Sequence, residues 1–146
     1  MKRLIMIIGA PGSGKTTKAK ELQQESPAVH VEADMYFTDL DGTYKFDPTK
    51  LAEAHDFCYN RAFAAMRQGV QVIVSNTFTK AWERVGYFEL ARKYGYEVLV
   101  IRMKNEYGSV HGVPEEKIKQ MRENAEPVTE NEVQGLKVTF KTIGGN

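Results

Sequence analysis

Hydrophobic and polar positions follow two different periods along the chain, and these periods predict strands and helices in turn. Short apolar runs rich in β-branched residues alternate with longer stretches in which apolar residues recur every three or four positions. Alternation of this kind is typical of βαβ units and of a parallel sheet. Strands are predicted at about Arg3–Ile8, Ala28–Val31, Gln71–Ser75, Glu97–Arg102 and Leu136–Ile143.

The helices between these strands carry recognisable start and stop signals. Asp47 and Pro48 place an N-cap residue before a proline at the first helical position. Glycines at 69 and 95 end two of the helices. The second helix carries one apolar stripe, made of Leu51, Ala54, Cys58, Ala62 and Ala65. Helices are predicted over 14–25, from 48 to the residue before 69, over 80–94 and over 115–123, with loops at 34–47 and 127–134.

These elements predict one α/β domain over residues 1–146, because a chain of this length can bury a single sizeable core. Every connection between strands contains a helix, so right-handed crossovers give an all-parallel core sheet. We expect Gln71–Ser75 to lie beside Arg3–Ile8. Leu136–Ile143 is expected at an edge, next to Glu97–Arg102.

The segment after the first strand has the form G-x-x-x-x-G-K-S/T, which predicts a phosphate-binding loop between a strand and a helix. Its backbone N–H groups and the helix N-terminus favour a chain of phosphates. Lys15 is expected to act in catalysis by bridging the β- and γ-phosphates, and the Thr16 hydroxyl to ligate Mg²⁺. The chain is therefore predicted to bind a nucleoside triphosphate. The binding residues of this segment are Gly9, Ala10, Pro11, Gly12, Ser13, Gly14, Lys15, Thr16 and Thr17.

Other strand ends should meet at the same edge of the sheet, where ligands of open parallel sheets bind. The second strand is followed by Glu32, Ala33 and Asp34. We favour Asp34 as the base that accepts a hydroxyl proton, or as a Mg²⁺ contact through water; the alternative is a solvated turn residue. The third strand ends in Ser75 and Asn76, without the acidic residue that many phosphate-loop proteins carry there. This leaves the metal to Thr16, the triphosphate and Asp34.

Two arginines beyond the fourth strand are candidate nucleotide contacts. Arg102 ends that strand, and Arg122 lies on the charged helix over 115–123, which could close over the phosphates. The alternative is a mixed, solvated surface helix. Several aromatics near Asp34 could stack a base or simply pack a long loop: Tyr36, Phe37, Tyr44, Phe46 and Phe78.

Composition limits the partners of the chain. Its formal net charge of +1 lacks the strongly basic character of dedicated nucleic-acid binders, although a local groove could hold a strand end. No apolar run approaches the roughly 20 residues that cross a bilayer. The single cysteine, Cys58, suits a reducing compartment, so we expect a cytoplasmic protein that does not engage a membrane. The sequence identifies no protein partner.

Several segments together resemble the small ATP-binding P-loop kinase-like family related to the kinase domain of phage polynucleotide 5′-hydroxyl kinase. They also resemble the P-loop domain of an animal ubiquitin-ligase-binding protein. The segments span roughly residues 1–124 and include the phosphate loop, Ala33–Phe37, Asp41–Pro48, Leu51–His55, Asn76-Thr77 with Ala81–Glu83, and His111–Pro114.

The resemblance implies a three-layer, nucleotide-kinase-like fold with core strand order 2-3-1-4, often with a fifth strand. It also implies ATP and Mg²⁺ as cofactors, a hydroxyl acceptor at a nucleic-acid or nucleotide end, and Asp34 as general base. Three positions depart from the family: Thr38 where the phage kinase has an arginine, Ser75-Asn76 where relatives have an aspartate, and Gly108-Ser109 where relatives often carry a lid arginine.

These departures keep two alternatives open beside a kinase that acts on a nucleic-acid end or a nucleotide. The near-neutral charge favours a kinase for a small hydroxyl compound. The absent arginines favour a module that binds nucleotide without efficient transfer, because an arginine clamp stabilises the transition state of phosphoryl transfer.

Overall fold

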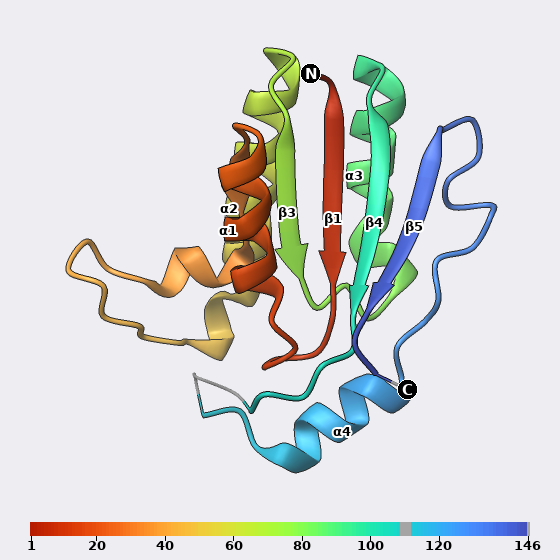
Figure 1. The fold of residues 1–146 in the computed structure, drawn as a ribbon. Coiled ribbons are helices and arrows are strands. Elements are labelled where there is room, and N and C mark those ends of the chain that lie inside the picture. The colour runs from red at the N-terminus through yellow and green to blue at the C-terminus, as the bar shows by residue number, and fades with distance from the viewer. Residues whose placement is uncertain (109–111, 146) are drawn as a thin grey trace.

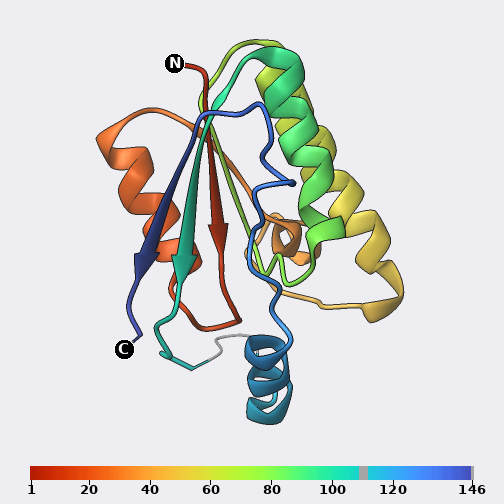
Figure 2. The same ribbon diagram turned by 90° about the vertical axis from the view of Figure 1, so that its right-hand side faces the viewer.

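A computed structural model of the chain describes residues 1–108 and 112–145. Five parallel strands form one sheet in the order β2-β3-β1-β4-β5, with helices on both faces (Figures 1 and 2). This confirms the predicted three-layer α/β fold, its core order 2-3-1-4 and its fifth strand at the edge beside β4. The strands are β1 (Arg3–Ile8), β2 (Val29–Val31), β3 (Val72–Asn76), β4 (Glu97–Met103) and β5 (Val138–Ile143).

The central strand is buried on both faces, which explains its unbroken apolar sequence. On one face, Leu4, Met6 and Ile8 pack in the core covered by α2 and α3. On the other face, Ile5 and Ile7 pack with Ala19 of α1. The helices are α1 (Lys15–Glu25), α2 (Leu51–Arg67), α3 (Ala81–Tyr94) and α4 (Glu115–Glu123).

Register brings the carboxyl ends of the strands to one edge of the sheet. Ile8 lies opposite Asn76 of β3 and Arg102 of β4, and Val31 lies opposite Val74. The loop after β1 and helix α4 lie at this edge, below the strand ends in Figure 1. Residues that follow different strands therefore come within reach of one ligand.

The region predicted as a loop over 34–47 is more ordered than expected. A 3₁₀ helix, η1 (Ala33–Phe37), leads into a hairpin in which Thr38 pairs with Tyr44. Its tip holds Gly42, whose φ of 87° suits a tight turn. We call residues 33–50 the projecting lobe, because they extend away from the sheet in Figure 1.

The start of the second helix also differs from the prediction. Asp47 does cap the backbone N–H of Thr49, at 3.0 Å from its Oδ1. The first turn is 3₁₀, η2 (Pro48–Lys50), and α2 begins only at Leu51. Leu51 is the first residue of α2 and is 42% exposed, so it does not belong to the buried stripe, whose other four predicted members are buried.

The segment after α4 is fastened to α3 by a fully buried arginine, Arg84. Its Nε and Nη2 donate to the two carboxylate oxygens of Glu132, at 2.8 and 3.1 Å. Its Nη1 donates to the carbonyls of Phe78 and Glu126, both at 2.9 Å. Arg84 therefore joins the segment after β3, at Phe78, to the segment after α4, at Glu126 and Glu132. Across 1–108 and 112–145, the helices lack the length and apolar character that would let one cross a membrane.

Candidate nucleotide-binding and phosphotransfer site

The phosphate loop keeps its shape through glycines at positions where a side chain does not fit. A Cβ at Gly9 would lie 2.5 Å from Ser13 Oγ and 2.8 Å from the Met103 carbonyl oxygen. Gly14 caps α1 in the left-handed region, with φ at 93°. The loop therefore leads directly into the N-terminus of α1, whose free N–H groups favour an anion.

Lys15 folds back over the loop that precedes it. Its Nζ donates to the carbonyls of Gly9 at 2.8 Å and Ala10 at 3.0 Å. Burial lowers the pKa of Lys15 to about 8, although the nearby carboxylates of Glu32 and Asp34 act in the opposite direction. The structure thus brings the predicted catalytic lysine close to two carboxylates that follow β2.

Glu32 lies at the candidate site, although our sequence reasoning did not select it as a site residue. Its carboxylate accepts from the Thr16 hydroxyl, with Oε2 at 3.1 Å, and from the Ser75 hydroxyl at 2.7 Å. His30 Nε2 lies 2.8 Å from Ser75 Oγ and 3.3 Å from Glu32 Oε2. Burial acts to raise the pKa of Glu32, but hydrogen bonds from His30 and Ser75 outweigh it and hold that pKa below its ordinary value.

This cluster supplies the acidic group that is missing at the end of β3. A carboxylate from the neighbouring strand reaches the hydroxyl of Thr16, which is the predicted metal ligand. Mg²⁺ prefers oxygen ligands and retains several waters, so Thr16 with Glu32 close by fits a metal that arrives with a triphosphate. In the part of the chain that the structure describes, no group of three or more His, Cys, Asp or Glu residues could hold a metal alone.

Asp34 lies exposed on η1, one turn beyond β2. Its Oδ1 accepts from the Tyr44 hydroxyl at 3.2 Å. Burial first, and then the charge of Asp34, raise the pKa of Tyr44 to about 12, so this phenol stays a donor at neutral pH. Thr38, which stands where the phage kinase has an arginine, donates to the Asp34 carbonyl at 3.4 Å.

Asn76 at the end of β3 has a positioning role. Its side-chain oxygen accepts from the backbone N–H of Ala33 at 2.8 Å, and its nitrogen lies 3.5 Å from the Cys58 sulfur. The side chain is buried, so it holds the start of η1 against the sheet. Asn76 therefore holds the backbone of Ala33, the residue before Asp34.

The contacts that the described structure shows for the two arginines that we selected are made outside the phosphate loop. Burial, and then the charge of Arg84, lower the pKa of Arg102, which places it on the α3 side of the sheet. Arg122 forms an ion pair with Glu106, in the segment after β4. Among the described residues, no hydrogen bond or ion pair joins either arginine to residues 9–17. Their role as nucleotide contacts stays a prediction.

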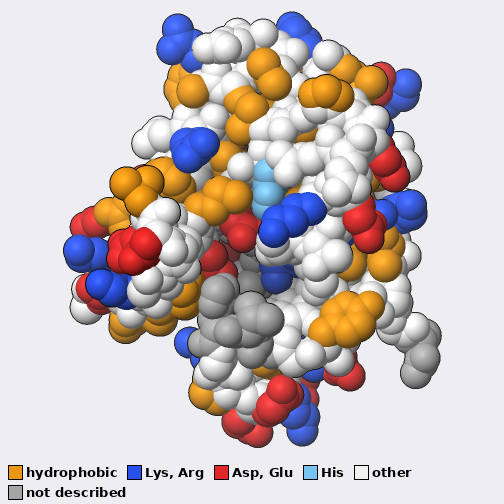
Figure 3. Space-filling model, turned by 60° about the vertical axis from the view of Figure 1, so that its left-hand side comes forward, with side chains coloured by type: hydrophobic (Ala, Val, Ile, Leu, Met, Phe, Trp, Pro, Cys, Tyr) orange, Lys and Arg blue, Asp and Glu red, His pale blue; other side chains and the backbone are white. Residues whose placement is uncertain are grey.

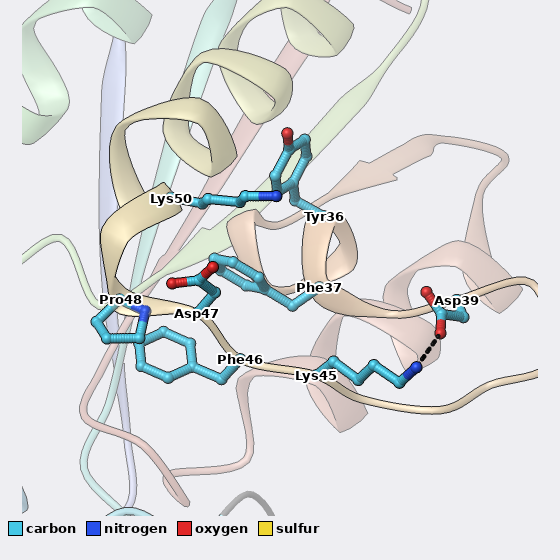
Figure 4. A pocket seen from close by; sticks show the side chains of 8 residues that line it. All are labelled: Tyr36, Phe37, Asp39, Lys45, Phe46, Asp47, Pro48 and Lys50. Carbon is cyan, nitrogen blue, oxygen red and sulfur yellow. Dashed lines mark ion pairs between the residues drawn. The ribbon is translucent and has the colours of Figure 1, made fainter.

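An open pocket of about 530 Å³ lies in the projecting lobe (Figure 4). The first of its lining residues along the chain is Tyr36, two positions after Asp34. Phe37 forms its buried wall and packs edge-on against Phe46, with ring centroids 5.2 Å apart. Lys45 and Lys50 enter from two sides, and Lys45 pairs with Asp39 at 3.6 Å. The lining residues are Tyr36, Phe37, Asp39, Lys45, Phe46, Asp47, Pro48 and Lys50.

The surface between the lobe and the body of the molecule is hollowed, as Figure 3 shows. Acidic side chains gather at this hollow, with a histidine and basic side chains along its side. Negative groups that face a phosphate loop are unfavourable for a bare triphosphate, but they suit a triphosphate that carries Mg²⁺.

Comparison with known proteins gives the family. A family model described as an AAA domain matches residues 4–106, which is well over half of the chain. The chain belongs to this family. Human NEDD4-binding protein 2 is 36% identical to this AAA domain over 132 residues, which cover 83% of the chain. The chain spans about 7% of the length of that human protein.

Solved structures with lower identity share the fold of this AAA domain. One is a chain from the structure of a Pnkp1/Rnl/Hen1 complex, with a TM-score of 0.56, 20% identity, and coverage of 81% of this chain and 38% of that one. Another is an unliganded sugar kinase from a Janibacter species, with a TM-score of 0.64, 16% identity, and coverage of 97% and 86%. The predicted P-loop kinase-like family is thereby confirmed.

Proposed function

We propose that this domain transfers the γ-phosphate of ATP to a hydroxyl group in a Mg²⁺-dependent reaction, with a nucleic-acid 5′ end or a nucleotide as acceptor. The observation that carries the proposal is the position of two carboxylates beside a phosphate loop: Glu32 accepts from the Thr16 hydroxyl, and the charges of Glu32 and Asp34 both act on Lys15. A cation for the phosphates and two carboxylates in one place are the groups that phosphoryl transfer requires.

Lys15, Glu32 and Asp34 have different proposed roles, which follow from their positions. Lys15 and the loop N–H groups hold the phosphates, and Glu32 holds the Thr16 hydroxyl where a metal ligand is needed. Bound Mg²⁺ would neutralise charge on the phosphate oxygens. Asp34 lies outside the Glu32 cluster and accepts from a phenol on Oδ1, so its carboxylate can also accept the proton of an incoming hydroxyl.

The pocket of the projecting lobe supports an acceptor with both a ring and a negative group. Phe46 and Tyr36 are 47% and 38% exposed, and aromatic rings stack bases of any sequence. Lys45 and Lys50 line the same pocket and can contact a negative group, beside Asp39, which pairs with Lys45, and Asp47. Nucleotides and strand ends carry this combination of base and phosphate.

A kinase for a small hydroxyl compound is the second candidate. Its support is the near-neutral charge of the chain and the likeness of the fold to a sugar kinase. The two candidates differ only in the acceptor, so one assay separates them.

The test begins with transfer of labelled γ-phosphate from ATP to 5′-hydroxyl oligonucleotides, nucleosides and sugars. Asp34→Asn keeps the size of the side chain but removes its basicity, so single-turnover transfer should fall by roughly 10²–10⁴-fold. ATP affinity, titrated separately, should change little because the phosphate loop is untouched.

Asp56→Asn is the matched control, because it makes the same change on an exposed position of α2. Equal transfer by Asp34→Asn and wild type would reduce Asp34 to a turn residue. If wild type binds ATP and phosphorylates no acceptor of any class, the domain is a nucleotide-dependent binding module instead.

A further inference from the structure

The segment that follows β4 is fixed against the phosphate loop by its backbone. The N–H of Tyr107 donates to the Gly12 carbonyl at 2.8 Å. The two chains approach so closely that a Cβ at Gly12 would lie 2.4 Å from the Gly108 carbonyl oxygen. Gly12 is therefore required both by its φ of 80° and by this contact. The phosphate loop itself sets the position of Tyr107.

The Tyr107 ring lies over the start of α1, yet most of its surface is open. Its Cε2 is 3.2 Å from the position of a Cβ at Gly14, and the Met103 methyl carbon is 3.5 Å from the same point. The side chain nevertheless remains 74% exposed. A ring whose backbone is held in place and whose surface is largely open gains little from packing, so it is available to a flat apolar ligand.

The sheet order gives the direction in which a triphosphate crosses the loop. Glu32 and Asp34 follow β2, on one side of β1; Glu32 reaches the Thr16 hydroxyl, and both charges act on Lys15. Tyr107 follows β4, on the other side of β1. With its γ-phosphate toward the carboxylates, a bound triphosphate extends its nucleoside toward β4 and Tyr107.

The residue before Tyr107 is tied to a second element. Glu106 forms an ion pair with Arg122 of α4, so the segment is held by the phosphate loop on one side and by α4 on the other. A platform that is held before ligand arrives loses less conformational entropy on binding than a mobile side chain does.

We propose that Tyr107 stacks on the base of the donor nucleoside triphosphate, an inference that rests on the proposed function. Stacking accepts every base, and a purine offers the largest face. Removal of the ring should weaken ATP binding by roughly 5- to 150-fold, from the usual cost of deleting an aromatic that stacks a base. The contact involves the base alone, so the phosphates should bind as before.

The test is calorimetric titration with two probes, ATP with Mg²⁺ and inorganic tripolyphosphate with Mg²⁺. Tyr107→Ala should weaken ATP binding by that factor and leave tripolyphosphate affinity unchanged. Tyr107→Phe should keep the affinity of wild type, because the ring remains. Phe140→Ala is the matched control: it removes an aromatic that is 56% exposed on the edge strand β5.

Three results would overturn the inference: ATP affinity of Tyr107→Ala within twofold of wild type, equal weakening of both probes, or tighter binding of both. Equal weakening of ATP and tripolyphosphate binding would mean that Tyr107 maintains the shape of the phosphate loop. Tighter binding of both would mean that Tyr107 blocks the phosphate loop when no ligand is bound. Failure of wild type to bind either probe would instead contradict the proposed function, and the inference would fall with it.

Discussion

Two basic side chains near the strand ends are shielded from solvent, Arg84 fully and Lys15 in part, and their partners differ in kind. Arg84 is fully buried, and its nitrogens donate to both oxygens of Glu132 and to backbone carbonyls. Lys15 donates only to two carbonyls of its own loop, and burial lowers its pKa to about 8. The charge of Arg84 is therefore balanced by a carboxylate of the protein. Lys15 has lost part of its hydration, and among the described residues no carboxylate lies at hydrogen-bond distance from it.

The surroundings of the two cations show the same contrast. Phe78 has a positive φ of 46°, which is unusual for a bulky residue, but its carbonyl accepts from Arg84 and its ring packs edge-on against Tyr87. In the phosphate loop, Ser13 Oγ is buried and has no hydrogen-bond partner among the described residues. The region around Arg84 therefore serves the fold, and the region around Lys15 is organised for a ligand.

Arg84→Met should have the largest effect on stability. It leaves the carboxylate of Glu132, whose side chain is 11% exposed, without its cation and removes the bonds that hold Phe78 and Glu126. We expect the free energy of unfolding to fall by about 3–5 kcal/mol, the usual cost of removing one partner of a buried ion pair. Urea denaturation measures it.

Lys93→Met on the exposed face of α3 is the control, and it should change stability by no more than about 0.5 kcal/mol. A loss of less than about 1 kcal/mol in Arg84→Met would show that the cluster around Arg84 is not a structural clamp.

Lys15→Met should give the opposite pattern. The free energy of unfolding should stay near that of wild type, because Lys15 makes no ion pair within the described structure and its burial is unfavourable to its charge. ATP affinity should fall roughly 10- to 150-fold, as expected when a charge-assisted hydrogen bond worth about 1.5–3 kcal/mol is lost.

Calorimetric ATP titration and urea denaturation of the same preparation measure both quantities. Lys20→Met, on the exposed part of α1, is the control. If Lys15→Met binds ATP as wild type does, the nucleotide site has been assigned to the wrong loop.

Glu132 links the Arg84 cluster to pH. Burial acts to raise the pKa of Glu132, but hydrogen bonds from Arg84 and Thr129 outweigh it and hold that pKa below its ordinary value. A carboxyl with a lowered folded-state pKa stabilises the fold above its unfolded pKa of about 4.3, and this contribution is lost as the pH falls through the folded value.

Glu132→Gln should therefore cost roughly 1–2 kcal/mol at pH 7 and reduce the loss of stability on acidification below about pH 4.5. Denaturation at pH 7, 5, 4 and 3 measures this. Parallel pH profiles for the variant and wild type would exclude Glu132 as a source of acid sensitivity.

The sequence was sufficient for the features that are set by local pattern. The apolar run before the phosphate loop and the glycines within it predicted β1, α1 and the loop between them, because strand burial and loop conformation depend on neighbouring residues. The edge position of β5 was also predicted correctly. Leu51 was misplaced because a 3₁₀ turn delays the start of α2, and helical periodicity does not reveal such a turn.

The remaining parts of the site depend on contacts between distant residues. Glu32 meets Ser75 only because Val31 pairs with Val74 across two strands, and strand register is not readable from one strand. One feature of the sequence could have pointed to Glu32. The end of β3 has no acidic residue, so a carboxylate at the metal position has to come from another strand. Arg84 and Glu132 are 48 residues apart, and either one alone resembles a surface charge.

Ser13→Ala should give the smallest effect, and it tests the contrast between the two regions most directly. The Ser13 hydroxyl is 1% exposed, and a buried hydroxyl without a partner costs free energy that an alanine avoids. We expect the ligand-free protein to become more stable by up to about 1 kcal/mol. Thermal denaturation with and without ATP and Mg²⁺ measures it.

Ser26→Ala removes a hydroxyl that does accept a hydrogen bond, from Gln71 at 3.3 Å, and is the matched control that should not gain stability. A loss of stability in Ser13→Ala would mean that the hydroxyl is satisfied within the loop, and the phosphate loop would then resemble the region around Arg84 in this respect.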